Sequence, residues 1–354
     1  MMFLGIAAGV GFLSWWLTRC LSHRDSLVVL LDHPNERSLH NVPTPRTGGL
    51  AILGSLFSGL IAVRVFGISA IGDSVPWREW NPLDLWILGM TMVLSMVSFW
   101  DDRGGISVWF RFGCQLAVSC LLGVGAGLIL PTITIPGWGS VEFGWSGIPL
   151  TILFLMWFAN LYNFMDGMDG FAGGMTVFGC GLLAYFAWKA GHDFILVLAV
   201  LLSVASAGFL WYNFPPAKIF MGDVGSVSSG FLCGALIVLG CRDRVFDVWV
   251  PLIVFSPFVL DATVTLLRRV RQRKKIWEAH RTHYYQRPVL SGWGHRKAVL
   301  AEYTVMALCG GLALLYHYAA GGWRLAVLGA WGLLFLFLAL AVNGVEQRNR
   351  LAGR

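Results

Sequence analysis

The sequence predicts an all-α, polytopic membrane protein with about eleven transmembrane helices, its N-terminus outside the cell and its C-terminus in the cytoplasm. Of its 354 residues, 56% are hydrophobic and 13% are charged, whereas a soluble domain carries about 25% charged residues. Many apolar runs are long enough to cross a bilayer, which takes about 20 residues. They centre near Val10, Ser58, Met92, Leu121, Leu155, Gly179, Val204, Leu232, Phe255, Leu308 and Leu333.

The basic residues predict the orientation. Most of the 26 Lys and Arg residues fall in loops that follow odd-numbered helices or at the C-terminus. Because cytoplasmic loops carry an excess of Lys and Arg, we expect those loops to face the cytoplasm. The seven cysteines are scattered through the apolar runs with no C-x-x-C pair, so neither a disulfide framework nor a zinc site is expected.

The polar segments of the chain also follow odd-numbered helices. They cover 21–47, 101–107, 160–172, 213–226 and 268–297, after the first, third, fifth, seventh and ninth helices. Loops with only structural roles would divide between the two faces of the membrane. The sequence therefore predicts one composite active site at the cytoplasmic surface, within a single membrane domain over 1–354. On the other face, a short hairpin is expected around Gly137 and Gly139.

The segment "NLYNFMDGMDG" carries the densest polar pattern. Asn160, Asn163, Asp166 and Asp169 recur at every third residue, so adjacent members are neighbours on a helix. Carboxylates at membrane depth cost about 2.5–3.5 kcal/mol each and usually mark a functional site. A single aspartate here would be typical of an ordinary helix end, but four polar residues in register indicate a binding site.

Two further acidic motifs suit metal or phosphate chemistry. Asp101 and Asp102 follow an apolar helix in "WDDRG", where acidic residues oppose the helix dipole. Adjacent carboxylates suit Mg²⁺, which is often held by one or two carboxylates together with phosphates. In "AKIFMGDVGS", Asp223 is a candidate metal ligand and Lys218 a candidate phosphate contact, although Asp223 and Ser226 also suit a helix cap.

The loop after the ninth helix, "RRVRQRKKIWEAHRTHYYQR", is strongly basic. Its first part, 268–275, is interpreted as an anchor on anionic lipid, and no nucleic-acid partner is expected. His280, Arg281 and His283 suit phosphate binding. They do not indicate zinc, because no third ligand lies nearby in the sequence.

The segment before the second helix, "SLHNVPTPRTGGLAI", has two interpretations. Pro43 and Pro45 restrict the residues before them to extended conformations, and His40 and Arg46 lie beside this turn. Contact with a substrate and a rigid entry into the helix explain the stretch equally well.

In this order, "DDRGG", "NFMDGMDG", "AKIFMGDVGS" and the histidine-bearing last loop resemble the polyprenyl-phosphate N-acetylhexosamine-1-phosphate transferases. This superfamily, glycosyltransferase family 4, includes the phospho-MurNAc-pentapeptide translocase of peptidoglycan synthesis, and the resemblance covers nearly the whole chain. It implies an enzyme of the bacterial cytoplasmic (inner) membrane, in which undecaprenyl phosphate attacks the β-phosphorus of a UDP-N-acetylhexosamine and releases UMP. Mg²⁺, or Mn²⁺, is the expected cofactor, and a homodimer is expected by family analogy alone.

The resemblance also implies roles for individual residues. Asp223 is the expected metal ligand, with Asp166 as a second, and Asp101 and Asp102 are the expected catalytic residues at the lipid phosphate. The remaining candidates are expected to bind the nucleotide and its diphosphate: Asn163, Asp169, Lys218, His280, Arg281, His283, Arg46 and His40. Each pair of unit charges on the two anionic substrates costs about 4 kcal/mol at 4 Å and an effective dielectric of 20, so their approach needs cations.

Three interpretations of the chemical step agree with the sequence. A phosphate monoester has its second pKa near 6 and is mostly dianionic at pH 7, so a strong general base is not obviously required. Asp101 acting as the base, Asp101 positioning charge, and a two-step route through an aspartyl-phosphate all stay open.

The stretch "HRTHYYQR" departs from the denser histidine cluster of the translocase. It resembles the branch that begins O-antigen (lipopolysaccharide) or other surface polysaccharide synthesis, often with a 6-deoxy amino sugar such as N-acetylfucosamine (FucNAc) or N-acetylquinovosamine (QuiNAc). A GlcNAc-1-phosphate transferase of the enterobacterial-antigen or teichoic-acid type is the alternative within the class. An ion-coupled transporter would place acidic residues near helix midpoints, which only Asp261 satisfies, and a scaffold leaves the clustered acids unexplained.

Overall fold

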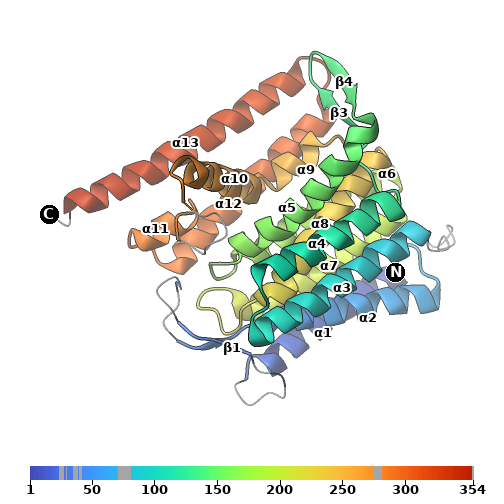
Figure 1. The fold of residues 1–354 in the computed structure, drawn as a ribbon, viewed down its shortest axis with the longest axis horizontal. Helices are drawn as coiled ribbons and strands as arrows, with labels where there is room; N and C mark the ends of the chain where they lie inside the picture. The colour runs from blue at the N-terminus through green and yellow to red at the C-terminus, as the bar shows by residue number, and fades with distance from the viewer. Residues whose placement is uncertain are drawn as a thin grey trace.

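The computed structural model describes residues 1–23, 28, 30–34, 39, 42–70, 81–274 and 281–352. Helices make up most of this part of the chain and form a bundle (Figure 1). The long helices are α1 (Met2–Leu21), α2 (Gly48–Phe66), α3 (Pro82–Gly104), α4 (Val108–Cys120), α5 (Gly147–Met165), α6 (Phe171–Ala190), α7 (Asp193–Asn213), α8 (Gly222–Arg242), α12 (His295–Tyr318) and α13 (Trp323–Ala352). The shorter helices are α9 (Trp249–Val254), α10 (Ser256–Arg271) and α11 (Gln286–Leu290), and α4 continues into a π-helical turn over Leu121–Gly125.

Ten helices among the described residues are long and apolar enough to cross a membrane, which confirms an all-α polytopic protein. The ninth of the roughly eleven expected spans differs, because the chain breaks at Phe255 into α9 and α10. Pro257 stands in the first turn of α10, where proline is tolerated because its missing N–H would have no partner. Helix α10 ends in Arg268, Arg269 and Arg271 and runs in a different direction from the bundle helices (Figure 1).

Helix α8 forms the centre of the bundle, and the apolar stretch that is long enough to cross a membrane is entirely buried inside the protein. It packs against α3, α5 and α2, and glycines allow the backbones to come close. A Cβ on Gly49 would stand 2.1 Å from Gly225 N, and a Cβ on Gly230 would stand 2.7 Å from Phe158 O. The first turn of α8 is therefore held against the helices whose ends carry the polar motifs.

Two small antiparallel ladders lie outside the helices. Strand β1 (Leu31–Asp32) pairs with β2 (Thr44–Pro45) before α2. Strand β3 (Thr132–Ile135) pairs with β4 (Gly139–Glu142), which confirms the hairpin expected around Gly137 and Gly139. Both glycines have positive φ, 86° and 107°, a region that favours glycine.

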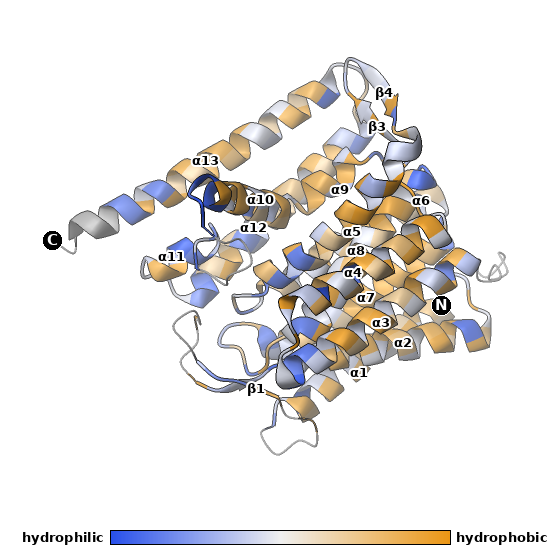
Figure 2. Ribbon diagram, viewed as in Figure 1, coloured by the Kyte–Doolittle hydropathy of each residue, from blue (hydrophilic) through white to orange (hydrophobic). Residues whose placement is uncertain are grey.

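The polar segments meet at one end of the bundle. Helices α3 and α5 end there, and α2, α4 and α8 begin there (Figure 1). Figure 2 shows hydrophobic helix middles and hydrophilic residues concentrated toward the helix ends and loops. The two chain termini lie on opposite sides of the molecule (Figure 1). That the polar end faces the cytoplasm stays a prediction.

Candidate active site

The chain before α2 and the chain before α8 form one backbone framework. Phe220 N–H donates to Pro45 O at 2.7 Å, and Gly48 N–H donates to Phe220 O at 2.9 Å. Gly222 has a φ of 71°, and a Cβ on it would stand 2.2 Å from Arg46 O. Glycine is therefore required in "MGD", and this close approach brings the aspartate that follows it to the end of the bundle.

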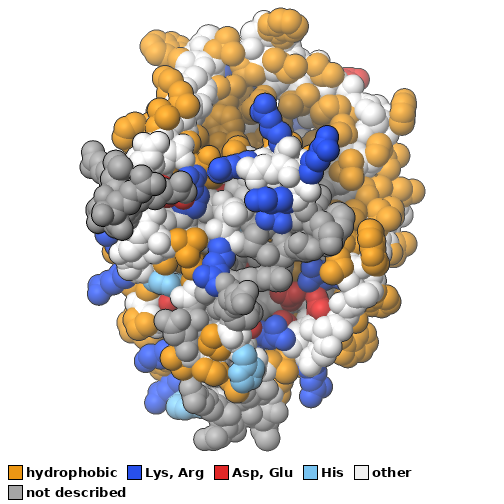
Figure 3. Space-filling model, turned by 60° about the vertical axis from the view of Figure 1, so that its left-hand side comes forward, with side chains coloured by type: hydrophobic (Ala, Val, Ile, Leu, Met, Phe, Trp, Pro, Cys, Tyr) orange, Lys and Arg blue, Asp and Glu red, His pale blue; other side chains and the backbone are white. Residues whose placement is uncertain are grey.

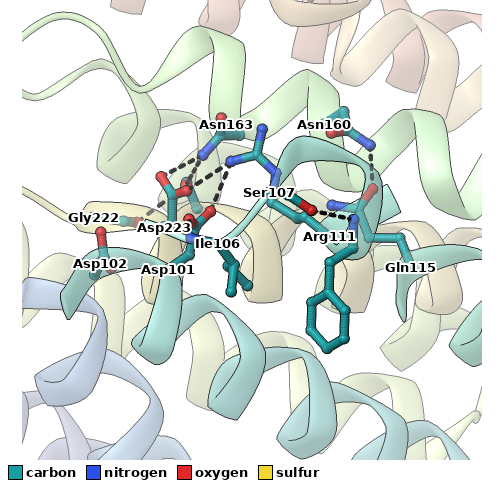
Figure 4. Close-up of polar contacts among 12 residues, drawn as sticks. Asp101, Asp102, Ile106, Ser107, Arg111, Gln115, Asn160, Asn163, Gly222 and Asp223 are labelled. Carbon is teal, nitrogen blue, oxygen red and sulfur yellow. Dashed lines mark hydrogen bonds and ion pairs between the residues drawn. The ribbon is translucent and has the colours of Figure 1, made fainter. Parts of the chain in front are cut away.

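Arg111 of α4 connects Asp101 of α3 with Asp223 of α8. Its Nη1 lies 2.9 Å from Asp101 Oδ2 and 3.1 Å from Asp223 Oδ2, as Figure 4 shows. Asn163 approaches from α5, and its Nδ2 donates to Asp223 Oδ1 at 2.7 Å and to Ser226 Oγ at 3.2 Å. Three of the sequence motifs thus meet around the Asp223 carboxylate, with a guanidinium between two of them.

The turn between α3 and α4 aims Asp101 and Arg111 at each other. Asp101 Oδ1 accepts from Ile106 N–H at 2.9 Å, which fixes the carboxylate at the end of α3. Ser107 then caps α4, because its Oγ accepts from Phe110 N–H at 3.2 Å. Arg111 follows one helical turn after this cap, on the side of the helix that faces the carboxylates (Figure 4).

Asp102 has different partners from its neighbour. The residue is 3% exposed, and its Oδ2 accepts from Val224 N–H at 3.2 Å in the first turn of α8. Arg46 Nε lies 3.6 Å from Asp102 Oδ1, and the Arg46 guanidinium also donates to the Asp102 carbonyl. A carboxylate is stabilised at a helix N-terminus by the free N–H groups and the dipole. Asp102 therefore holds α3, α8 and Arg46 together, while Asp101 faces Arg111.

Asp166 stands among other carboxylates at the end of α5. It is the residue that follows the last helical turn. Burial raises the pKa of Asp166 well above its usual value, and the negative charges of Asp223, Asp102 and Asp169 raise it further. A cation beside this carboxyl would favour its charged form.

Asp169 and Asn213 tie the "DGMDG" loop to the chain after α7. Asp169 Oδ2 accepts from Ala217 N–H at 3.0 Å and lies 3.5 Å from His295 Nδ1. Asn213 Oδ1 accepts from Gly170 N–H at 2.9 Å. These contacts give the loop a defined position between α7 and the start of α12.

Asp261 holds the last polar loop. Its carboxylate accepts from the N–H groups of Tyr284 and Tyr285, each at 2.9 Å, and lies 3.2 Å from His283 Nδ1. Tyr285 Oη in turn donates to Phe164 O on α5 at 3.1 Å. Asp261 thus positions the last loop against the end of α5.

Other candidate residues lie outside the Arg111 contacts. Lys218 is exposed, and its Nζ lies 5.9 Å from the centre of the Tyr212 ring. Asn160 donates to Gln115 Oε1 at 2.6 Å (Figure 4), and Arg281 is partly buried. Two candidates lie outside the described residues: His40 and His280.

Some polar residues of the site carry no recognisable motif. In the sequence, Arg111 resembles any other cation that follows an apolar run, and its only signal is that Gln115 follows four residues later, on the same helical face. Asn213 and His295 stand at the end of one apolar helix and at the start of another. Their roles depend on how the helices pack.

The acidic side chains fit a divalent cation that arrives with part of its own coordination. No three His, Cys, Asp or Glu side chains within the described ranges are placed to hold a metal ion. Mg²⁺ is usually bound by one or two carboxylates, with waters and substrate phosphates completing its octahedron. Asp223 and Asp166 are the carboxylates that fit such a pair, since the negative charge of Asp223 adds to burial in raising the pKa of Asp166.

Figure 3 shows the face at this end of the molecule. Acidic side chains gather near its middle, and Lys and Arg side chains surround them. Positive charge around a site attracts anions from solution, so the face suits an anionic substrate that brings a cation to the acidic centre.

Known proteins are similar to this chain over most of its length. Residues 85–241 match glycosyl transferase family 4. The chain is 31% identical to a probable undecaprenyl-phosphate N-acetylglucosaminyl 1-phosphate transferase of Bacillus subtilis, over 78% of this chain and 74% of that protein. It is 31% identical to a decaprenyl-phosphate N-acetylglucosaminephosphotransferase of Mycolicibacterium smegmatis, over 77% and 71%. It is 28% identical to a phospho-N-acetylmuramoyl-pentapeptide-transferase of Halalkalibacterium halodurans, over 77% and 82%.

Proposed function

We propose a specific reaction for this chain, which belongs to the polyprenyl-phosphate N-acetylhexosamine-1-phosphate transferases of glycosyl transferase family 4. It transfers an N-acetylhexosamine-1-phosphate from a UDP-sugar to undecaprenyl phosphate in the bacterial cytoplasmic membrane. A lipid phosphate oxygen forms a bond to the β-phosphorus. The bond from that phosphorus to the bridging oxygen breaks, and UMP leaves with the electron pair.

The contacts of Arg111 with Asp101 and Asp223 carry this proposal. They join two acidic motifs at the ends of apolar helices, where a phosphate anchored in the membrane and a soluble nucleotide can both arrive. Two anionic substrates repel each other, at about 4 kcal/mol per charge pair at 4 Å. A site that combines a guanidinium with carboxylates for a metal ion supplies the charge to bring them together.

The residues of the site then take distinct roles. Asp223 and Asp166 would hold Mg²⁺, or Mn²⁺, which neutralises the diphosphate when bound. Arg111 and Arg46 supply positive charge from the protein to the phosphates. Because the lipid phosphate is mostly dianionic at pH 7, Asp101 serves to orient Arg111 rather than to remove a proton.

Two donor sugars fit, each on its own observation. The resemblance of the stretch "HRTHYYQR" to the branch that begins O-antigen or other surface polysaccharide synthesis favours a 6-deoxy N-acetylated amino sugar. The named activities of the similar proteins of Bacillus subtilis and Mycolicibacterium smegmatis favour UDP-N-acetylglucosamine. In both cases the donor is an N-acetylated hexosamine.

UMP release by the purified protein tests the function. The assay supplies undecaprenyl phosphate, Mg²⁺ and a panel of UDP-N-acetylhexosamines, and one sugar is expected to give lipid-dependent UMP that EDTA abolishes. Asp223→Asn is expected to abolish turnover in a folded protein. Asp243→Asn is the control, since Asp243 lies past the other end of α8 and binds Arg242 at 2.8 Å. Absence of UMP with every sugar, while a relative turns over in parallel, would refute the function.

A further inference from the structure

The Gln286 side chain is buried, and its amide oxygen lacks a hydrogen-bond partner among the described residues. The residue is 6% exposed. Its amide lies beside Tyr285 Oη, which donates its proton to Phe164 O at 3.1 Å. Because that proton is used toward Phe164, the Nε2 end of the amide is the one that suits Tyr285. This leaves Oε1 as the free atom, and it has no hydrogen-bond partner in the described part of the chain.

A buried carbonyl oxygen without a partner is costly, at about 1–3 kcal/mol. Such groups in native proteins are usually completed by water, an ion or a ligand. The oxygen of Gln286 is an acceptor, so a hydrogen-bonding partner brings an N–H or an O–H. Phosphate oxygens are themselves acceptors, which excludes the charged part of the substrates as the partner.

The position of Gln286 is set by a rigid support. Tyr285 is 2% exposed, its ring centre lies 4.8 Å from that of Phe171, and its N–H is held by Asp261 at 2.9 Å. Gln286 N–H donates to His283 O at 3.2 Å. The amide is therefore placed by packing and by the contacts of Asp261.

This support brings Gln286 against the "DGMDG" loop. A Cβ on Gly167 would stand 2.4 Å from Tyr285 Oη and 3.1 Å from Gln286 Nε2, so only glycine allows so close an approach. Gly167 directly follows Asp166, the proposed ligand of the metal at the diphosphate. The Gln286 amide therefore lies beside that point through its Nε2, and its neutral free oxygen suits the part of the donor attached to the β-phosphate, which is the sugar.

We propose that Gln286 is a specificity-determining residue whose Oε1 accepts a hydrogen bond from the sugar of the nucleotide donor. The partner is the acetamido N–H or a hydroxyl of the hexosamine. The inference rests on the proposed function and adds to it the residue that reads the sugar. Asp261 acts as a positioning residue, because it holds the backbone of Tyr285.

Donor selectivity tests the assignment. Gln286→Met keeps the length of the side chain and removes the acceptor. Steady-state kcat/KM is measured with UDP-N-acetylglucosamine, with UDP-glucose, which lacks the acetamido group, and with a 6-deoxy UDP-N-acetylhexosamine, which lacks one hydroxyl. We expect about a tenfold loss for the preferred donor, the effect of one hydrogen bond, and little loss for the analogue without the contacted group. The donor analogue whose kcat/KM is unchanged by Gln286→Met lacks the group that Gln286 contacts, and so identifies that group.

Two further variants make the test decisive. Gln286→Asn keeps the amide but withdraws it by one methylene, so it is expected to shift selectivity in the same direction with less risk to folding. Gln115→Met is the matched control, because Gln115 is also a buried glutamine, 2% exposed, in the same end of the bundle. It is expected to leave the ratio of the donors unchanged. UDP binding, measured by titration calorimetry, should be the same in wild type and in both Gln286 variants.

The outcomes separate the two proposals. A wild-type protein that releases no UMP with any donor refutes the proposed function, and this inference with it. The inference alone is overturned if the wild-type protein turns over and the Gln286 variants keep the wild-type ratio of kcat/KM between donors. It is also overturned if the loss of kcat/KM in these variants is matched by an equal loss of affinity for UDP. In that case the oxygen of Gln286 is satisfied by water or by the uridine.

Discussion

Replacing Arg111 by methionine is expected to destabilise the protein when no divalent cation is present. The guanidinium lies 2.9 Å from Asp101 and 3.1 Å from Asp223, so its loss leaves both carboxylates with less compensation. Methionine keeps much of the apolar stem of arginine, so the packing contribution of that stem is largely retained. The change therefore reports mainly on charge.

The expected loss in the free energy of unfolding depends on how exposed these side chains are to solvent. Arg111, Asp101 and Asp223 have side-chain exposures of 23%, 12% and 28%. A charge pair at 4 Å is worth about 4 kcal/mol at an effective dielectric of 20, while exposed pairs measure about 0.2–1 kcal/mol. For two partly hydrated pairs we expect a loss of about 1–3 kcal/mol.

Thermal unfolding in detergent, first in EDTA and then with Mg²⁺, measures this loss. The variant should melt below wild type in EDTA, and Mg²⁺ should raise its midpoint more than that of wild type, since a cation that binds the native state stabilises it. Arg111→Lys keeps the charge without the planar guanidinium, so its melting midpoint in EDTA should lie between those of wild type and Arg111→Met. Arg103→Met is the control, because Arg103 lies over the Phe99 ring at 5.4 Å. A wild-type midpoint and Mg²⁺ response in Arg111→Met would refute the reasoning.

The metal-free protein is expected to lose stability as pH rises from about 4 through the raised pKa of Asp166, because the native state binds that proton more tightly than the unfolded state. Asp166→Asn should flatten the dependence of the melting temperature on pH in EDTA, and an unchanged slope would contradict this. Asp261→Asn turns an amide N–H₂ toward backbone donors, so KM for the UDP-sugar should rise several-fold while kcat changes less; equal loss in both would contradict a positioning role. Gly49→Ala places a Cβ 2.1 Å from Gly225 N and should abolish the folded yield in size-exclusion chromatography, whereas Gly89→Ala meets nothing within 4 Å and should not. Equal yields would show that α2 has room to move from α8.

Hydropathy and charge parity predicted which segments meet, because both are properties of the order of residues along the chain. An odd number of expected crossings precedes each polar segment, so the sequence predicts that these segments share one membrane face whatever the packing. The contact of Asn163 with Asp223, 2.7 Å between Nδ2 and Oδ1, agrees with this prediction. The role of Arg111 depends instead on how α4 rotates against α3 and α8, and no pattern in the sequence specifies that rotation.

Adjacent residues also took different roles that the sequence does not distinguish. Asp101 and Asp102 were predicted as catalytic residues at the lipid phosphate, which stays a prediction, but successive side chains on a helix point about 100° apart. Asp102 therefore turns to the N-terminus of α8 at Val224, and Asp101 turns to Arg111. The two aspartates therefore make contacts with different helices from the same turn.

The break at Phe255 explains why depth in the membrane was a poor guide to Asp261. A continuous ninth helix would bury this carboxylate near the middle of the bilayer, where an ion-coupling role is the natural interpretation. The chain instead ends α9 and begins α10 in a new direction, so Asp261 faces the loop of Tyr284 and Tyr285. Thr265 Oγ1 adds a further hydrogen bond at 3.0 Å. Hydrogen bonds to the charged form stabilise a buried carboxylate, and these contacts account for Asp261 as the residue that holds the last loop.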